Sequence, residues 1–256
     1  MKFHLLYVSS VSACFELENT SPYYAGDTFE VTVNGAPALE GVRTNVFSLF
    51  DLQPATEYCV AIGQESLTFT TKSETACLNV ADFGAVGDGK TDDTAAIQSA
   101  INLCAVGGRV LVPAGTYYVR PLVLKSHMTL ELKKDALLLA DTCEEHYPIL
   151  PGEIRDAQTG NEIQVSSWEG NPFPCRQSFI SAYHAEDIAV VGQGIIDGNA
   201  RPDDKVCLIF TAICLLLPVL SVLPVRKISK DIFFTLYLCV CAFSLLLFAF
   251  GMYNRK

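Results

Sequence analysis

The stretch NVADFGAVGDGKTDDT, residues 79–94, decides the fold of this chain. Its apolar start indicates a short strand, and Gly84, Gly87 and Gly89 then allow backbone angles that other residues avoid. Residues 91–93, Thr-Asp-Asp, can each accept hydrogen bonds from free N–H groups at the start of a helix, and carboxylates suit the positive end of a helix. The stretch therefore predicts a strand, a glycine-rich turn and a capped helix start.

The helix itself is predicted over residues 94–104, because its apolar residues recur at the spacing of one helical face. These residues are Ile97, Ala100, Ile101 and Cys104. The Gly-Gly pair at 107–108 ends the helix. Short apolar segments separated by turn residues follow, and they lie at residues 110–112, 117–119, 122–124, 128–132, 136–139, 179–180, 188–191 and 195–196. One amphipathic helix followed by such a ladder of strands indicates a lid on the end of a β-solenoid.

Two motifs carry a resemblance to a known family. Residues 79–119 resemble the opening of the pectate-lyase-like right-handed parallel β-helix superfamily, and GQGIIDGN at 192–199 is similar to the polygalacturonases of glycoside hydrolase family 28. The resemblance covers about residues 78–200, the N-terminal part of a family catalytic domain. It implies an incomplete parallel β-helix, a pectic oligosaccharide or polysaccharide as partner, and hydrolysis of α-galacturonide links as the parent activity.

A different pattern precedes this region. Residues 15–18 and 29–33 alternate apolar and polar side chains in the strand period, and Asn34-Gly35 is a hairpin signal. LQPATEYCV at 52–60 resembles the corner of fibronectin type III modules, in which the hydroxyl of a tyrosine, here Tyr58, ties back to a nearby backbone group. The sequence predicts a fibronectin III-like β-sandwich that either contacts substrate or serves as a spacer packed on the β-helix.

The C-terminal segment differs from both. Residues 206–225 and 232–254 are uncharged apolar runs, each long enough to cross a bilayer about 30 Å thick, and basic residues lie between them. We therefore expect a mainly β chain in three parts: a sandwich at 1–75, the β-helix at 76–200, and two hydrophobic, transmembrane helices within 201–256.

Charge and cysteine usage limit the other possibilities. A net charge of −10 argues against nucleic acid, since phosphate binding needs clustered Lys and Arg. The ten cysteines include no Cys-x-x-Cys pair, which argues against a zinc site or a redox pair and favours free thiols. The apolar run at 3–8 is too short for a signal peptide. We expect a membrane location if the tail is genuine and a cytoplasmic one otherwise.

No catalytic residue is assigned. The resemblance implies catalytic carboxylates on Asn-Thr-Asp, Gly-Asp-Asp and Gly-His-Gly motifs with an Arg-Ile-Lys motif for substrate, and none of the four occurs in the sequence. Asp92 and Asp93 fall in the helix-capping turn instead. A calcium-dependent lyase would need an aspartate cluster, which the sequence lacks, so neither a metal nor a cofactor is expected.

Substrate contacts are expected in the long segment at 141–177, because loops of this length in compact folds are often functional. Trp168 and His146 could stack on a sugar ring or bond a carboxylate. The alternative is that Trp168 pins the segment to the solenoid.

Three interpretations stay open. The first is a polygalacturonase-like chain whose gene was truncated or frame-shifted near Ala200 and which is inactive. The second is a membrane-anchored, non-catalytic protein that binds pectic sugar or has a structural role. The third is an active enzyme with other catalytic residues, such as a lyase. The missing motifs and the abrupt change at Arg201 favour the first interpretation, and whether the chain is an enzyme stays open.

Overall fold

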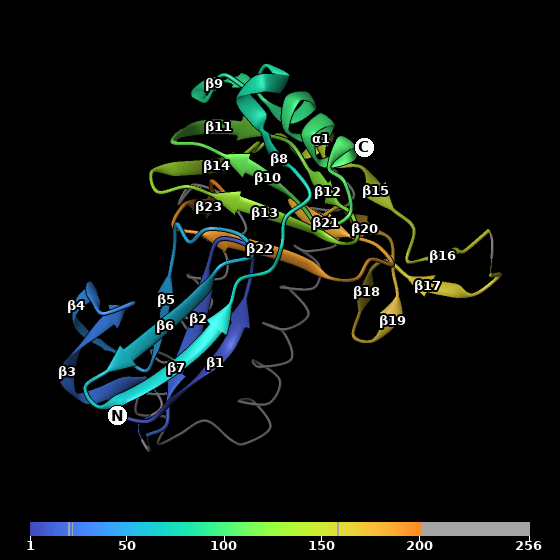
Figure 1. Cartoon of the computed structure of the whole chain (residues 1–256). Helices are drawn as coiled ribbons and strands as arrows, with labels where there is room; N and C mark the ends of the chain where they lie inside the picture. The colour runs from blue at the N-terminus through green and yellow to red at the C-terminus, as the bar shows by residue number, and fades with distance from the viewer. Residues whose placement is uncertain (20, 22, 158, 201–256) are drawn as a thin grey trace, which may run out of the picture. The chain divides into compact units, whose positions relative to one another are not determined.

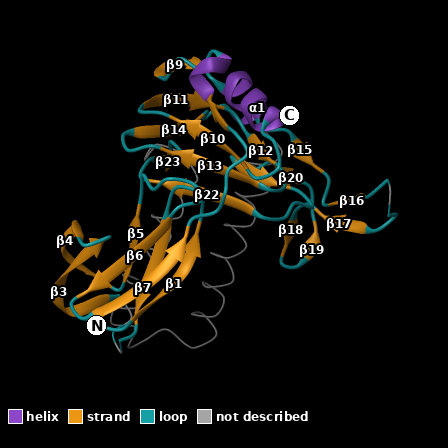
Figure 2. Ribbon diagram, in the orientation of Figure 1, coloured by secondary structure: helices purple, strands orange, loops and turns teal. Residues whose placement is uncertain are grey.

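The computed structural model describes residues 1–19, 21, 23–157 and 159–200 (Figure 1). The chain up to Ala200 forms one compact unit. The apolar runs at 206–225 and 232–254, and with them the predicted tail 201–256, lie outside the described residues. In the part that is described, no helix is long and apolar enough to cross a membrane. That part is mainly β, and α1 (Thr94–Leu103) is its one α-helix (Figure 2).

The N-terminal segment folds into two antiparallel sheets. The first sheet has the order β1 (Phe3–Val8), β2 (Ala13–Leu17), β5 (Val46–Leu49), and the second has the order β4 (Ala36–Thr44), β3 (Tyr24–Val33), β6 (Glu57–Ile62), β7 (Glu65–Thr70). Aromatic rings fill the space between the sheets. The Phe15 ring stacks on Phe47 at 5.3 Å and meets Phe69 edge-on at 5.5 Å. The expected β-sandwich is therefore present.

Two sequence signals in the sandwich are confirmed. The Tyr58 hydroxyl accepts a hydrogen bond of 2.8 Å from the backbone N–H of Gln53, which is the expected tie to a nearby backbone group. Asn34 and Gly35 join β3 to β4 with φ values of 51° and 81°. Positive φ at both central residues is what a tight two-residue hairpin requires, and Asn-Gly adopts it readily.

Three parallel sheets make up the region from residue 77. They have the orders β8 (Cys77–Asn79), β10 (Gly108–Val112), β13 (Met128–Leu132), β22 (Ile188–Gly192); β9 (Asp88–Asp92), β11 (Gly115–Val119), β14 (Ala136–Ala140), β23 (Ile195–Asp197); and β12 (Leu122–Leu124), β21 (Ile180–Ala182). The chain visits the sheets in turn, so the first two sheets gain one strand per coil, and the third gains one strand from each of the two middle coils. This is a parallel β-helix, and the predicted strands agree with it to within two residues at either end.

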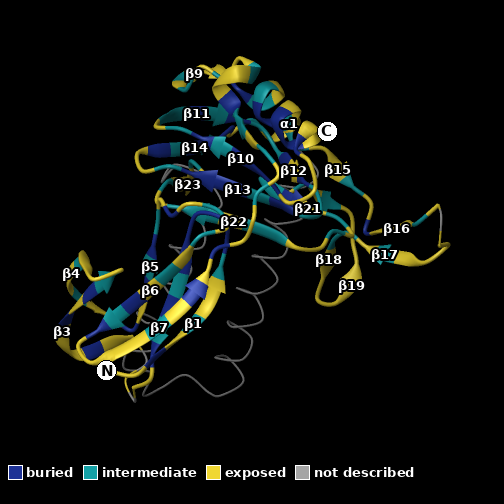
Figure 3. Cartoon of the chain, in the orientation of Figure 1, coloured by how far each residue is buried: buried dark blue, intermediate teal, exposed yellow. Residues whose placement is uncertain are grey.

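Side chains stack through the coils in register. Leu130 pairs with Val110 on one side and Val190 on the other, and Leu138 lies next to Ile196. Leu130 and Leu138 have no exposed surface, whereas Val190 is 46% exposed because β22 has a described neighbour on one side only (Figure 3). Burial in the solenoid therefore depends on coverage by both neighbouring coils.

Helix α1 covers the first coil. Ile97, Ala100 and Ile101 are fully buried, as the apolar spacing predicts, and α1 packs on η1 (Val80–Phe83) and β12. The structure corrects the prediction that Asp93 caps the start of this helix.

The Asp93 carboxylate makes no hydrogen bond to the helix. It accepts instead from the backbone N–H groups of Val86 at 2.7 Å and Gly87 at 3.0 Å, so it closes the glycine turn. Asp92 is the capping side chain, since it accepts from the N–H of Thr94 at 3.1 Å.

The segment between β14 and β21 has more structure than the sequence predicts. It begins with η2 (Glu144–His146) and continues into six short strands, β15 (Ile149–Leu150), β16 (Glu153–Arg155), β17 (Glu162–Gln164), β18 (Ser167–Trp168), β19 (Asn171–Pro172) and β20 (Cys175–Arg176). Strand β15 pairs with β20, β16 with β17 and β18 with β19, all antiparallel. We call residues 149–176 the arm, and Figure 1 shows β16 to β19 beyond the three sheets.

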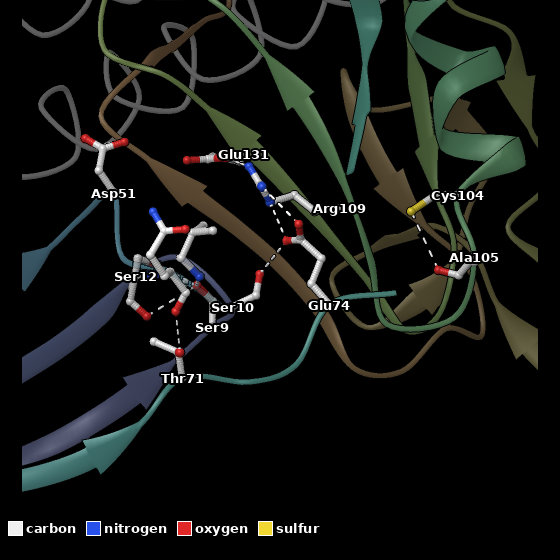
Figure 4. Close-up of polar contacts among 12 residues, drawn as sticks. Ser9, Ser10, Ser12, Asp51, Thr71, Glu74, Cys104, Ala105, Arg109 and Glu131 are labelled. Carbon is white, nitrogen blue, oxygen red and sulfur yellow. Dashed lines mark hydrogen bonds and ion pairs between the residues drawn. The ribbon is translucent and has the colours of Figure 1, made fainter. Parts of the chain in front are cut away.

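Buried charges join the sandwich to the β-helix (Figure 4). Glu74, in the linker after β7, accepts from Arg109 Nε at 2.7 Å and Nη2 at 3.1 Å, and from the Ser10 hydroxyl at 3.0 Å. Arg109 Nη1 also pairs with Glu131, and the Arg109 and Glu131 side chains are only 11% and 4% exposed. Burial opposes ionisation of Glu74, but the hydrogen bonds and charge of Arg109 outweigh it and lower the pKa of Glu74.

Candidate functional site

A polar cluster lies where the chain leaves the coils for the long segment. Asp141 directly follows β14, and its backbone N–H still donates to Val119 of β11 at 2.8 Å. Because β9, β11 and β14 are parallel neighbours, their carboxyl ends meet at this one edge of the sheet. We call Asp92, Tyr118, Arg120, Asp141, His146 and Tyr147 the Asp141 cluster.

The Asp141 carboxylate is the buried centre of the cluster, with a side chain that is 1% exposed. It accepts from the backbone N–H of Cys143 at 2.8 Å, it is hydrogen-bonded to Tyr118, and its Oδ2 meets Nδ1 of His146. Burial opposes ionisation of Asp141, but these hydrogen bonds outweigh it and lower the pKa of the carboxyl. The hydrogen bond to Asp141, aided by burial, raises the pKa of Tyr118 to about 12.

Arg120 approaches the same carboxylate oxygen. Its Nε lies 3.7 Å from Asp141 Oδ2 and 2.9 Å from Asp92 Oδ2. Nε is buried and makes no aligned hydrogen bond, so both contacts are ion pairs only. The backbone N–H of Arg120 donates to the Thr94 hydroxyl at 2.8 Å, which ties the end of β11 to the start of α1.

This arrangement fixes the donor and acceptor character of the cluster. Asp141 can accept the proton of His146 Nδ1, and the imidazole then has Nε2 left for another partner. The Tyr147 hydroxyl donates to the Asp141 carbonyl at 2.7 Å and holds η2 against the end of β14. The cluster can therefore present an oriented imidazole and a guanidinium to a ligand.

The two residues predicted from the sequence lie in different places. His146 belongs to the Asp141 cluster. Trp168 lies on β18 of the arm and is 65% exposed, which is too high for a side chain that pins the segment to the solenoid. Among the described residues no hydrogen bond or ring contact joins Trp168 to His146. Exposed Phe173 and Ile149 accompany Trp168 on the arm.

Sequence reasoning missed Asp141, Arg120 and Tyr118. A signal for two of them existed, because Arg120 directly follows the predicted strand 117–119 and Asp141 lies two positions after the predicted strand 136–139. Tyr118 pairs in register with Asp92, and Val119 with Ala140, so the sheet register is what gathers these residues. Within the described ranges, no group of three or more side chains could hold a metal ion.

Three parallel sheets wound in coils, closed at one end by a helix, define a pectate-lyase-like β-helix protein. A family profile described as "Rhamnogalacturonase A/epimerase, pectate lyase-like" matches residues 77–131. Over these residues the chain is similar to that superfamily, and polygalacturonases are among the proteins that it resembles.

Two such relatives and one solved structure illustrate the relationship. An exo-poly-α-D-galacturonosidase of Dickeya chrysanthemi is 36% identical over 140 residues, 52% of this chain and 21% of that protein. A probable polygalacturonase of Vitis vinifera is 32% identical over 132 residues, 47% of this chain and 24% of that protein. The chain therefore spans less than a quarter of these relatives.

The solved structure is that of the family 28 exopolygalacturonase of Yersinia enterocolitica. It superposes with a TM-score of 0.53 and 24% identity over 79% of this chain and 42% of that one. At this identity the likeness shows the fold alone.

Proposed function

We propose that this chain is a polygalacturonase-like protein of the glycoside hydrolase family 28 type, that its ligand is pectic polysaccharide, and that it binds this ligand without hydrolysing it. The observation that supports the ligand class most directly is the relationship to the Dickeya exo-poly-α-D-galacturonosidase over half of the chain. The shared β-helix fold agrees with it.

The absence of hydrolysis is inferred from the carboxylates. Inverting hydrolysis needs one carboxylic acid to protonate the leaving oxygen and a carboxylate to activate water. None of the four family motifs occurs in the sequence. Asp141 is the most buried carboxylate of the candidate site, and its hydrogen bonds lower its pKa, which is the opposite of what a general acid requires.

We further propose that the N-terminal sandwich is a fibronectin type III module. Its sheets of three and four antiparallel strands and the hydrogen bond at Tyr58 support this proposal. The likeness to the Yersinia structure covers 79% of the chain, which exceeds residues 77–256 and so includes part of the sandwich. Its role is that of a spacer held on the β-helix by Glu74, Arg109 and Ser10.

Binding and reducing-end assays together test the main proposal. The full chain should be retarded in a gel that contains polygalacturonate and should migrate normally in a gel that contains neutral galactan. It should release no reducing ends from polygalacturonate above an unrelated acidic protein. Normal migration in both gels would rule out pectic polysaccharide as the ligand. Measurable release of reducing ends would show that the chain is an active enzyme.

A membrane-anchored, non-catalytic sugar-binding protein is the second proposal. It is supported by the apolar runs at 206–225 and 232–254 in the sequence. In this case the membrane is the location, and the β-helix is the part that meets the polysaccharide.

A further inference from the structure

We propose that Arg120 and His146 form a binding site for the carboxylate of a uronic acid unit, at the edge where β9, β11 and β14 end. This inference rests on the proposed function and names the contact that would recognise the ligand. The observation behind it is that the guanidinium of Arg120 and the imidazole of His146 both meet the same buried carboxylate oxygen, Oδ2 of Asp141.

The two side chains are held close together. Arg120 Nε and His146 Nδ1 both lie within 4 Å of the same atom, Oδ2 of Asp141. Asp141 comes from the end of β14, Arg120 from the end of β11, and His146 from η2. The Asp141 carboxylate is buried, whereas the side chains of Arg120 and His146 are 42% and 36% exposed. The exposed parts of a guanidinium and an imidazole therefore lie over a buried anion.

The acceptors of the cluster are already used within the protein. Asp141 is bonded to Tyr118, Cys143 N–H and His146. Asp92 Oδ1 accepts from the N–H and hydroxyl of Thr94, and its Oδ2 faces Arg120 Nε. The carboxylate oxygens of Asp92 and Asp141 are therefore already engaged, and the carboxylate of Asp141 is also buried, so the cluster does not suit a cationic ligand.

The donors, in contrast, are left over. Within the described part of the chain, neither the Nη groups of Arg120 nor Nε2 of His146 has a hydrogen-bond partner. A guanidinium edge binds a carboxylate through two parallel N–H···O bonds, and an imidazolium, whose Nε2 carries a proton while Nδ1–H donates to Asp141, can add a third. Asp141 holds the imidazole in place from the opposite side, so little rotational freedom is lost on binding. The chemistry left at the surface thus fits a carboxylate better than a hydroxyl.

The carboxylates next to Arg120 limit which anions the site can bind. Arg120 is offset by Asp92 and Asp141, so the cluster does not attract anions indiscriminately. A ligand must supply an oxygen pair that fits the guanidinium edge. Repeated carboxylates on a pectic chain meet this condition, whereas neutral galactan has the same ring without the carboxylate.

Two substitutions isolate the site. Arg120→Gln removes the guanidinium. His146→Asn keeps an N–H in the position of Nδ1 for Asp141 and removes the outward Nε2. Arg155→Gln is the matched control, because Arg155 forms an exposed ion pair with Glu162 on the arm and lies outside the cluster. Thermal melting of each full-length variant establishes that it is folded.

The measurement is affinity electrophoresis of the full chain in polygalacturonate and in neutral galactan. We expect Arg120→Gln and His146→Asn each to weaken retardation by polygalacturonate about tenfold, the loss of one charge-assisted contact. Arg155→Gln should stay within about twofold of the unchanged protein. If Arg120→Gln fails to fold, His146→Asn decides alone.

The outcomes separate this inference from the proposed function. Folded variants that bind polygalacturonate as well as the unchanged chain would overturn the site and leave the proposed function intact. Equal retardation by galactan and polygalacturonate would overturn carboxylate recognition. An unchanged chain that binds neither polymer would overturn both.

Discussion

Arg109 shows at the scale of a residue how the chain holds buried charge. Its side chain is 11% exposed and lies between Glu74 and Glu131, and Lys133 meets Glu131 at 2.9 Å and Asp51 at 2.6 Å. A buried ion pair adds little when complete, but removal of one partner leaves an uncompensated charge. The network therefore costs much more to break than it contributes when whole.

The first prediction follows from this asymmetry. Arg109→Ala should lower the free energy of unfolding by about 3–5 kcal/mol, because Glu74 and Glu131 would lose their shared cation. Urea unfolding of the full chain measures it. Arg155→Ala, which breaks an exposed pair, should change the same quantity by less than about 1 kcal/mol. Equal effects of the two substitutions would contradict the role of the network.

The second prediction concerns acid. The pKa values of Glu74 and Asp141 are lowered in the folded chain, so both carboxyls bind protons more readily when unfolded. Their contribution to stability is present above the unfolded pKa, about 4, and is lost as pH falls through the folded values. Unfolding measured from pH 7 to pH 3 should show this loss. Glu74→Gln and Asp141→Asn should each flatten the acid limb, and an unchanged slope would contradict the assignment.

The third prediction concerns the sandwich. Tyr58→Phe removes the acceptor of the Gln53 N–H and should destabilise the isolated segment 1–75 by about 1 kcal/mol. Tyr23→Phe is the control, since that ring is 73% exposed. Circular dichroism during urea unfolding reports both. A disordered spectrum of the unsubstituted segment would show that it does not fold alone.

At the scale of elements, α1 is the lid of the solenoid. Ile101 is fully buried on its inner face, and Leu103 on the same helix is 70% exposed. Ile101→Ala should cost about 2–5 kcal/mol through lost burial and the cavity left behind. Leu103→Ala should cost much less. Thermal unfolding compares the two, and similar losses would mean that the helix does not seal the first coil.

Helices and strands whose apolar residues recur with a clear period could be predicted from the sequence, and those without such a period could not. The strands at Leu122–Leu124 and Met128–Leu132 agree with the prediction because apolar residues and turns mark them directly. The strands of the arm are only two or three residues long, so no alternation announces them. The choice between Asp92 and Asp93 as cap also escaped prediction, since it depends on where the glycine turn places its N–H groups.

The candidate site could be predicted only in part for a related reason. His146 stood out as a histidine in a long segment. Its partner Asp141, and the residues Tyr118 and Arg120 that meet Asp141, lie up to 28 positions earlier, and only the pairing of β11 with β14 brings these three together. Register between parallel strands joined by several turns is not visible in local sequence patterns.

For the full chain, the property to test is whether it resides in the membrane of the cell. The runs at 206–225 and 232–254 lead us to expect the full chain in the membrane fraction of expressing cells, resistant to alkaline carbonate. A chain that ends at Ala200 should be absent from that fraction. Ultracentrifugation with immunoblotting separates the two. Recovery of the full chain as a monodisperse soluble monomer would contradict the expectation.

The arm leaves the coils after β14 and returns at β21, and both ends are fixed by parallel pairing, β14 to β11 and β21 to β12. The separation of the two ends is therefore set by the solenoid and not by the length of the arm. Doubling a flexible loop between fixed ends adds only about 0.6 kcal/mol of closure entropy. Natural selection can thus shorten, extend or replace this excursion while every coil keeps its register, which makes it the place where ligand preference can diverge without a new fold.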